Sequence, residues 1–448
     1  MNVGFRLLQT LMMTTFGVAC ASAEPSRGVS HRTTLRRNSD VCHVRTLTGG
    51  GELTLGQDTM VFIDNPTIAV HESGVAILGG DGFRYRLARK NEFVEADTSS
   101  VQRVFGIWQP TRGASVPIET TEIQSGASGN PLVAISGPRE LDVVWRSAIV
   151  SDRDTSWQLV QGRWVNGTWY DVRSMLDGFN RNLLTQPFTS RAVASAHGSW
   201  AYLLVESVRR TASALQLRHV GRSWIVDTIA TLEAMHPTVV VLDSQMAIVA
   251  GLAGREPYGN TIVSFRRDKA QPQVTDEARV SLPNLPIVQW SFAFPLPGSV
   301  GIIYAGGRSG REDAFFPAVS QDSGRTWQAG PSIELGESIL AWDAVHDGAG
   351  RALILANLVD RSLPSGSELR LLLYDSVLRS WQVLWRAGSE VAAFGVPAVG
   401  FANGRLHLAF SAATQNAPRL PVTHLLSFAL ECRAEDPPSI ASPSGGRD

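Results

Sequence analysis

The sequence predicts an all-β fold of the β-propeller class, with seven four-stranded blades as the preferred count and six as the alternative. Three observations support this prediction. A strand–turn–strand unit recurs along the 448 residues, further short strands follow each unit, and no helical periodicity separates the units. A β-solenoid is the alternative architecture, but its repeats would be shorter and more regular than these.

Each repeat begins with a short apolar run, a turn rich in Gly, Pro, Asn, Asp or Ser, and a second apolar run. This pattern is typical of a β-hairpin. The nearly continuous apolar character of the strands indicates burial on both faces. Seven such hairpins begin at Pro66, Pro131, Arg191, Pro237, Gln289, Ala341 and Val396. Their spacing is about that of propeller blades.

Each hairpin is followed by a third strand, a turn and, in several repeats, a Trp that opens a fourth strand. The segments LVQGRWVNGTWYDV, LRHVGRSWIVD and LLYDSVLRSWQVL show this order, and SQDSGRTWQAG takes the same place in the fifth repeat. In the first repeat, Phe93 is expected to replace the Trp. Four strands in each repeat favour a propeller.

The seventh repeat supplies three strands after Val396, and the segment that begins at Cys42 can supply the fourth. In an antiparallel pair, the end of one strand lies beside the start of its partner. Cys432 is therefore expected to lie beside Cys42, and the N-terminal strand to close the ring in the last blade. An oxidising compartment favours a disulfide between them, and two free thiols are the alternative.

The N-terminus has the features of a secretory signal peptide. Arg6 precedes the apolar run Leu7 to Val18, and Ala21-Ser22-Ala23 gives a cleavage pattern, so we expect cleavage after Ala23 and a secreted or periplasmic protein. Lipidation at Cys20 is the alternative, although the usual large aliphatic residue three positions earlier is absent. The expected organisation is a signal peptide at 1–23, a disordered tail at 24–41, a propeller at 42–432 and a disordered tail at 433–448.

The formal net charge of −1 argues against a nucleic-acid binder that works by bulk charge. No later stretch is long and apolar enough to span a bilayer. The sequence also lacks a His/Cys cluster, a phosphate-binding Gly loop and a Gly-x-Ser-x-Gly elbow. We therefore expect no metal, no cofactor, no transmembrane segment and a monomer.

The segment SQDSGRTW matches the pattern S-x-D-x-G-x-T-W, known as the Asp-box. On this motif the chain resembles the sialidase-like propellers with bacterial neuraminidase repeats. The resemblance depends on Ser320, Asp322, Gly324, Thr326 and Trp327. Asp can accept hydrogen bonds from its own turn, Gly can adopt a positive φ, and Trp can fill space between sheets, so these residues are expected to be structural. The turns VGRSW and SVLRSW keep the hydroxyl and the Trp but lose the acid.

The loops that join second to third strands lie on the opposite face, which carries the active site in the resembled family. Nearly all of them contain arginine, whose planar guanidinium binds carboxylates in a bidentate manner. The candidate ligand-binding residues are Arg146, Arg255, Arg308, Arg311 and Arg361. Acids accompany them, so loops whose Arg residues balance Asp and Glu in solvent remain the alternative.

Sialidase chemistry uses a tyrosine nucleophile, a glutamate that activates it and an aspartate acid–base. By resemblance, these roles would fall to Tyr258, Glu256 and Asp64, and Tyr304 is expected near the same face. Two features depart from the family. The early Arg-Ile-Pro type motif is absent, with Arg84-Tyr85-Arg86-Leu87 a poor match, and seven blades are counted where the enzymes usually have six.

Three functions are compatible with these residues, because a fold does not determine an activity. The preferred one is a secreted propeller that binds a glycan or an extracellular protein, including an anionic one, on its arginine-bearing face. The alternative is an exo-α-sialidase-like glycoside hydrolase. A structural or assembly role as a rigid hub is the third, and it predicts a large apolar patch in place of a polar pocket.

Overall fold

The structure is a computed structural model that divides the chain into two units, Met1–Asp40 and Val41–Asp448. It describes residues 42–47, 51–55, 59–80, 82–87, 93–95, 104–119, 131–150, 155–174, 192–194, 200–206, 212–220, 223–232, 235–241, 246–253, 261–268, 271–281, 287–296, 299–307, 312–360, 362–363, 366–387, 391, 393–413 and 421–432. For parts of these ranges, including 146–159 and 192–290, only the backbone is described. The predicted signal peptide, the cleavage site after Ala23, Cys20 and both predicted tails lie outside the described residues.

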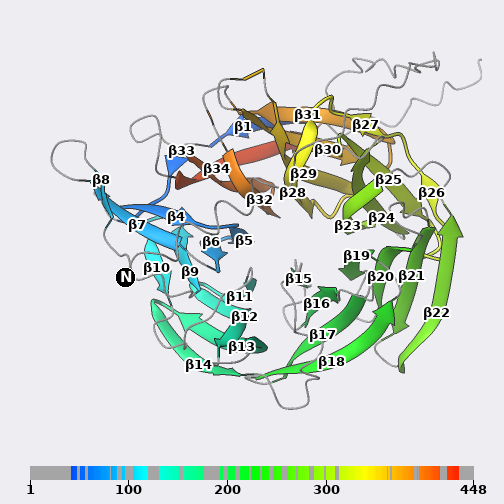
Figure 1. The fold of residues 1–448 in the computed structure, drawn as a ribbon, viewed down its shortest axis with the longest axis horizontal. Coiled ribbons are helices and arrows are strands. Elements are labelled where there is room, and N and C mark those ends of the chain that lie inside the picture. The colour runs from blue at the N-terminus through cyan, green and yellow to red at the C-terminus, as the bar shows by residue number, and fades with distance from the viewer. Residues whose placement is uncertain are drawn as a thin grey trace, which may run out of the picture. The chain divides into compact units, whose positions relative to one another are not determined.

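The described residues form eight antiparallel sheets, most of them four-stranded (Figure 1). The first sheet contains β5 (Thr67–His71), β6 (Gly74–Gly79), β9 (Phe105–Pro110) and β10 (Val116–Glu119). The second contains β11 (Leu132–Gly137), β12 (Glu140–Val150), β13 (Thr155–Val165) and β14 (Thr168–Ser174). The third contains β15 (Ala192–Ala194), β16 (Trp200–Glu206), β17 (Ala212–Val220) and β18 (Ser223–Leu232). The fourth contains β19 (Met235–Val241), β20 (Met246–Ala253), β21 (Thr261–Asp268) and β22 (Gln271–Ser281).

The remaining sheets include the one that holds both ends of the described chain. The fifth contains β23 (Ile287–Leu296), β24 (Ser299–Gly307), β25 (Ala314–Ser320), β26 (Gln328–Ala329) and β27 (Ile333–Glu334). The sixth contains β28 (Ser338–His346), β29 (Arg351–Val359), β30 (Ser367–Asp375) and β31 (Ser380–Arg386). The seventh contains β32 (Ala393–Ala402), β33 (Arg405–Ala413), β34 (Pro421–Cys432), β1 (Cys42–Thr46) and β2 (Gly51–Glu52). An additional sheet contains β3 (Thr54–Leu55), β4 (Thr59–Ile63), β7 (Gly82–Leu87) and β8 (Phe93–Glu95).

All seven predicted hairpins are present as the first and second strands of the seven sheets. Neighbouring sheets meet mainly through their first strands. The contacting pairs are β5 with β11, β11 with β15, β16 with β19, β19 with β23, β23 with β28, β28 with β32, and β32 with β5. The all-β prediction is therefore confirmed, and this order of contacts returns to the strand from which it starts.

The prediction for Phe93 was wrong. Phe93 begins β8, which pairs with β7 in the additional sheet, and the third strand of the first sheet is β9. The segment between β6 and β9 thus leaves the first sheet, adds two strands beside β4, and returns. The large aromatic residue of the first sheet is Trp108 on β9, which is fully buried.

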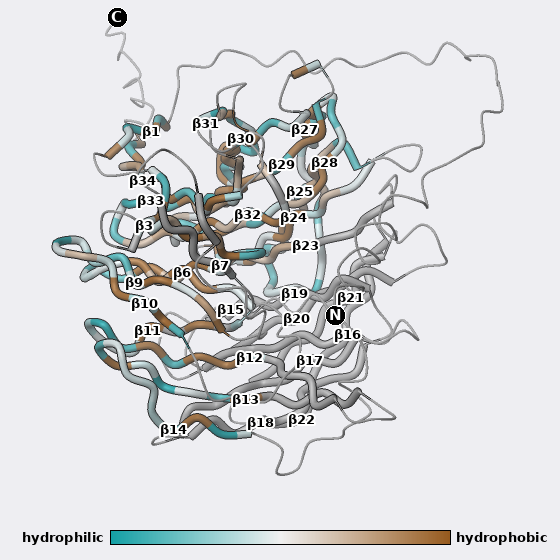
Figure 2. The backbone as a smooth tube through the Cα atoms, turned by 60° about the vertical axis from the view of Figure 1, so that its left-hand side comes forward, coloured by the Kyte–Doolittle hydropathy of each residue, from teal (hydrophilic) through white to brown (hydrophobic). Residues whose placement is uncertain are grey.

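Buried clusters connect neighbouring sheets. The indole rings of Trp108 and Trp164 lie 6.4 Å apart between the first and second sheets. Phe315 meets Trp342 at 5.1 Å between the fifth and sixth sheets. Hydrophobic segments follow strands such as β6, all of whose residues are buried (Figure 2). Strands that are buried on both faces need apolar residues at successive positions, which explains the nearly continuous apolar runs of the repeats.

Gly106 on β9 is expected to be intolerant of any side chain. A Cβ atom there would lie 2.2 Å from the carbonyl oxygen of Ile77 on β6. We expect Gly106→Ala to lower the free energy of unfolding by about 1–3 kcal/mol, because neither backbone can move without disturbing the ladder. Gly51→Ala is the matched control, since nothing lies within 4 Å of the added Cβ. Urea unfolding of both variants checks this prediction, and equal midpoints would contradict it.

The predicted pairing of the N-terminal strand with the last strand of the seventh sheet is confirmed. β1 pairs with β34 in antiparallel register, with Cys42 opposite Cys432, and a disulfide joins these two residues across a sequence separation of 390. β2 continues along the same strand, with Gly51 opposite Leu425. The N-terminal segment therefore completes the seventh sheet. No helix with the length and hydropathy of a membrane span is found among the described residues.

Candidate functional site

The antiparallel strands of each sheet give it two ends, illustrated by the sixth sheet. At one end lie the turn from β28 to β29 and the turn from β30 to β31, and we call this the turn end. At the other end lie the link from β29 to β30 and the first residues of β28, and we call this the link end. The antiparallel order of these strands places the start of β28 beside the end of β29.

The Asp-box lies at the turn end of the fifth sheet, between β25 and β26. Asp322 Oδ1 accepts hydrogen bonds from the Ser320 hydroxyl and the Thr326 amide, both at 2.8 Å, and its Oδ2 accepts from the Thr326 hydroxyl at 2.7 Å. The Gly324 amide donates to Ser320 Oγ at 2.7 Å, and Gly324 has a φ of 89°. Trp327 is buried. The side chains of the motif therefore hold the turn from β25 to β26 through their own hydrogen bonds.

Burial opposes ionisation of Asp322, but the hydrogen bonds outweigh it. Donation by the Thr326 amide, the Thr326 hydroxyl and the Ser320 hydroxyl lowers the pKa of Asp322 to about 2. Hydrogen bonds to the ionised form favour that form. At neutral pH the Asp-box is thus a turn held by a carboxylate, and its stability depends on that charge.

We expect Asp322→Asn to lower the free energy of unfolding by about 1–2 kcal/mol at pH 7, because hydrogen bonds to a charged acceptor are lost. The native pKa is about 2, below the ordinary value of 3.8. The stabilisation is therefore present above pH 4 and disappears as the pH falls from 4 to 2. Urea midpoints of both proteins at pH 7, 4 and 2 measure this, and a difference that persists at pH 2 would contradict it.

A second turn of this type was missed in the sequence. Asp375, at the end of β30, accepts hydrogen bonds from the amides of Val377 and Leu378, both at 2.9 Å. It lies six residues before Trp381, whereas Asp322 lies five before Trp327. The degenerate turn SVLRSW is therefore directly preceded by an acid, Asp375, which lies one position farther from its Trp than the acid of the Asp-box does. Asp347 likewise accepts from the amide of Ala349 at 2.8 Å in the turn from β28 to β29.

At the link end, the first strands of four consecutive sheets have irregular pairing with their second strands. The register shifts lie between Met235 and Thr238 in β19, Val288 and Trp290 in β23, Ile339 and Ala341 in β28, and Phe394 and Ala398 in β32. Each shift falls near the start of its strand. Such bulges re-aim side chains and are frequent beside active sites. In β28 the residue left out of the ladder is Leu340, whose side chain is 58% exposed.

The bulge of β32 is fixed by two asparagines. Asn65 Oδ1 accepts a hydrogen bond from the Val396 amide at 3.1 Å, and Asn357 Nδ2 donates to the Gly395 carbonyl at 3.3 Å. A Cβ at Gly395, which has a φ of 66°, would lie 2.9 Å from Asn65 Oδ1. Asp64, a candidate from the sequence, is exposed directly beside Asn65. The structure thus places Asp64 at the link end, next to this bulge.

A network of charges lies at the link end of the sixth sheet. The Arg370 guanidinium, buried on β30, donates to both oxygens of Glu368 and to Glu337 Oε2 at 3.3 Å, and its Nη1 donates to the Leu335 carbonyl at 3.2 Å. Arg386 Nη1 lies 3.4 Å from Glu368 Oε1, and its side chain is 56% exposed. Hydrogen bonds from Ser362 and the charge of Arg370 lower the pKa of Asp360.

Oxygen atoms of Glu337, Asp360 and Glu368 lie within 4.8 Å of one another, as metal ligands would. Arg370, however, pairs with Glu337 and Glu368. We therefore interpret this group as an ion-pair network and assign no metal to it.

Burial raises the pKa of two further groups near the link end. Burial raises the pKa of Glu312 to about 7, and the Glu312 carbonyl accepts a hydrogen bond from the Ile339 amide at 2.6 Å, beside the bulge of β28. Burial raises the pKa of Tyr304 well above its ordinary value of 10. In the described part of the chain the Tyr304 hydroxyl has no hydrogen-bond partner. These surroundings disfavour a phenolate and hence a nucleophilic Tyr304.

Most residues predicted for the site lie outside the described residues, namely Arg255, Glu256, Tyr258, Arg308, Arg311 and Arg361. The strands around them are described. The links that contain them join β20 to β21, β24 to β25 and β29 to β30, which are second and third strands as expected. Arg146 lies within β12, opposite Leu159, and its side chain is not described. The structure therefore brings Asp64 to the link end and leaves the arginines as predictions.

Glu368 and Arg370 were missed because they lie inside a strand. The signal was present in SELRLLLYD, where two charges stand two residues apart in an otherwise apolar run. Alternation places them on the same face of β30. Leu372 and Tyr374, two and four positions after Arg370, belong to the cluster shared with the fifth sheet. This places the charged pair on the face of the sixth sheet that packs against the fifth.

No family model matches the chain, and no curated protein matches it. Among solved structures, the polysaccharide lyase Uly1 is similar with a TM-score of 0.51 and 11% identity, over 82% of this chain and 90% of the lyase. A protein of unknown function from Dyadobacter fermentans gives 0.46 and 11%, over 87% and 99% of the two chains. The Trypanosoma rangeli sialidase gives 0.44 and 10%, over 86% of this chain and 59% of the sialidase chain. The likeness to the lyase concerns the fold alone, and the two lower scores support no statement about function.

Proposed function

We propose that the chain is an exported propeller of seven four-stranded blades that binds a glycan at the link end of its sheets. The resemblance through Ser320, Asp322, Gly324, Thr326 and Trp327 supports a place among the Asp-box propellers. Seven sheets that repeat one hairpin, and contacts that lead from β5 back to β5, support the blade count. On this proposal the propeller spans residues 42–432, after a signal peptide cleaved behind Ala23.

The difference between the two ends of the sheets carries the proposal. At the turn end, the carboxylates of Asp322, Asp347 and Asp375 accept hydrogen bonds from amides of their own turns. These carboxylates therefore stabilise the turns. At the link end, the described residues include bulged first strands, the exposed side chain of Leu340 and an ion-pair network centred on Arg370. Loops on a rigid scaffold that combine apolar contact with a few placed polar groups are typical of ligand sites.

The chemistry of these groups favours a ligand rich in hydroxyl groups that also carries carboxylates. Arginines in the links, with Arg255, Arg308 and Arg361 as the best candidates, can bind a carboxylate in a bidentate manner. Acids such as Asp64 and Glu337 can accept hydrogen bonds from sugar hydroxyls. An acidic glycan matches this mixture of donors and acceptors better than a wholly anionic or an apolar ligand.

The test is binding of the purified chain to immobilised glycans, with neutral and carboxylate-bearing members compared. We expect selective binding of carboxylate-bearing glycans that Arg308→Ala weakens at least tenfold, as a lost charge-assisted contact predicts. Arg325→Ala is the matched control, because Arg325 lies in the Asp-box turn at the opposite end. Absence of glycan binding, or equal losses in both variants, would contradict the proposal. Capture of an extracellular protein without glycan would favour the protein ligand.

A fluorogenic sialic acid glycoside tests the hydrolase alternative in the same preparations. Turnover that Arg308→Ala abolishes and Arg325→Ala preserves would replace the binding proposal by sialidase chemistry, with Asp64, Glu256 and Tyr258 as the catalytic group. Turnover absent from the parent chain, together with glycan binding, would support a binding propeller.

A further inference from the structure

The two cysteines that the disulfide joins pack against the same apolar cluster but differ in exposure. Cys42 is fully buried, in the cluster that joins the sixth and seventh sheets. Cys432, at the end of β34, is partly exposed. Thiol–disulfide exchange requires direct approach of the attacking sulfur to one of the two. An external thiol therefore meets Cys432 first.

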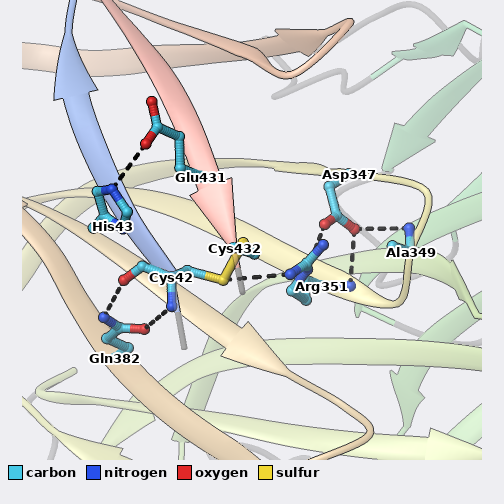
Figure 3. The surroundings of a disulfide bond; sticks show 8 residues. All are labelled: Cys42, His43, Asp347, Ala349, Arg351, Gln382, Glu431 and Cys432. Carbon is cyan, nitrogen blue, oxygen red and sulfur yellow. Dashed lines mark hydrogen bonds and ion pairs between the residues drawn. A yellow bond between two sulfur atoms is a disulfide. The ribbon is translucent and has the colours of Figure 1, made fainter. Parts of the chain in front are cut away.

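Arg351 faces the buried sulfur. Its Nη1 donates to Cys42 Sγ at 3.3 Å, and its Nε donates to Asp347 Oδ2 at 2.5 Å. Asp347 also accepts from the amides of Ala349 and Arg351, so the whole arrangement is tied to one turn (Figure 3). Asp347 balances part of the charge on Arg351 but leaves Nη1 directed at the sulfur. A guanidinium in this place stabilises a thiolate at Cys42.

The backbone of Cys42 is held independently of the disulfide. Gln382 Oε1 accepts a hydrogen bond from the Cys42 amide at 3.3 Å, and Gln382 Nε2 donates to the Cys42 carbonyl (Figure 3). The pairing of β1 with β34 continues from Cys42 to Thr46. Breaking the bond between the sulfurs therefore leaves Cys42 beside Arg351, in position to react again.

We propose that this disulfide exchanges in one fixed order with a dithiol–disulfide exchange protein. A thiolate of the partner attacks Cys432 Sγ, the bond between Cys432 and Cys42 breaks, and its electron pair leaves on Cys42 Sγ as a thiolate beside Arg351. The second thiol of the partner, as its thiolate, then attacks the partner's own sulfur in the mixed disulfide. Cys432 is released as a thiolate and the partner departs oxidised. Re-formation of the disulfide runs in reverse. The Cys42 thiolate attacks Cys432 Sγ in the mixed disulfide, and the sulfur of the partner leaves as a thiolate.

The order of attack is tested with glutathione, a monothiol that leaves the mixed disulfide in place. The purified chain would carry Cys20→Ser, so that two cysteines remain. After brief exposure, acid quenching and alkylation of the free thiol, peptide mass spectrometry locates each group. We expect glutathione on Cys432 and the alkyl group on Cys42. An equal distribution, or glutathione mainly on Cys42, would overturn the proposal.

The role of Arg351 as a positioning residue is tested by the rate of reduction with dithiothreitol. We expect Arg351→Gln to slow reduction by about three- to tenfold, because a leaving thiolate of higher pKa departs more slowly. Arg351→Lys should restore most of the rate. Arg379→Gln, in the turn from β30 to β31, is the matched control and should leave it unchanged.

If Arg351 had a purely structural role, the rate of reduction would change in the opposite direction. Loss of a structural contact would loosen β1, expose Cys42 and make reduction faster in Arg351→Gln. A rate equal to or above that of the parent chain would therefore overturn the proposal, even for a destabilised variant.

Discussion

Replacing both Cys42 and Cys432 by serine is expected to lower the free energy of unfolding by about 3–5 kcal/mol. The disulfide joins residues 390 apart, so it restricts the unfolded chain across nearly the whole fold. Without it, β1 is held by five residues of backbone pairing, by the two hydrogen bonds of Gln382 to the Cys42 backbone, by a hydrogen bond between His43 and Glu431, and by an ion pair of Arg45 with Glu431. The contacts of Glu431 are exposed, and exposed ion pairs contribute little. Urea unfolding of the oxidised parent and of the double variant measures the difference.

Reduced parent protein is the control for this prediction, because it loses the cross-link and keeps both cysteines. It should unfold close to the double variant. A difference of less than about 1 kcal/mol between the oxidised parent and the double variant would contradict the prediction, since the loss of chain entropy in the unfolded state is expected to be largest for a loop as long as this one. That result would mean that the pairing of β1 with β34 suffices to hold the seventh sheet.

Arg370→Met is expected to lower the free energy of unfolding by about 3–5 kcal/mol, because it leaves a buried carboxylate without its main partner. The side chain of Glu368 is 8% exposed, and Arg370 donates to both of its oxygens. Arg386 also contacts Glu368, but the Arg386 side chain is largely exposed and cannot replace a buried partner. Thermal and urea unfolding at neutral pH check this prediction.

The double variant Glu368→Leu with Arg370→Met separates charge from packing. Replacing a buried ion pair by apolar residues of similar volume is often neutral or stabilising. The double variant should therefore recover most of the stability that Arg370→Met loses. A double variant as unstable as the single one would show that Arg370 stabilises through its packing and its bond to the Leu335 carbonyl. The contact of Arg370 with Glu337 contributes little to this difference in the free energy of unfolding, because the Glu337 side chain is only partly buried.

The hairpins and the disulfide could be predicted because their signals are local or follow from strand direction. Turn residues such as Asn166 and Gly167, which have φ values of 50° and 97°, mark where a chain can reverse. Once the seventh repeat lacks a fourth strand, antiparallel pairing brings Cys42 beside Cys432 without further information. The Asp-box was predictable for the same reason, since the hydrogen bonds that Asp322 accepts come from within Ser320 to Thr326.

The additional sheet and the bulges could not be predicted, because they depend on partners distant in sequence. β7 pairs with β4 across a separation that no local pattern reveals, and Phe93 was assigned to the wrong sheet as a result. A bulge adds one residue to a strand without changing its composition, so Leu340 has the same apolar character as its buried neighbours. The ion pair of Glu368 with Arg370 lies within an apolar strand, whereas functional residues are expected mainly in loops.

The joining of β1 to β34 through Cys42 and Cys432 closes the chain between these two residues into a covalent circle. A protease that cuts one link between sheets would open this circle without separating it into two pieces. Both fragments would stay connected through sulfur until a reductant acts, and they would migrate together on a non-reducing gel. A molecule with one such cut thus keeps every sheet tethered, and two cuts within the circle are needed before a part of it can diffuse away.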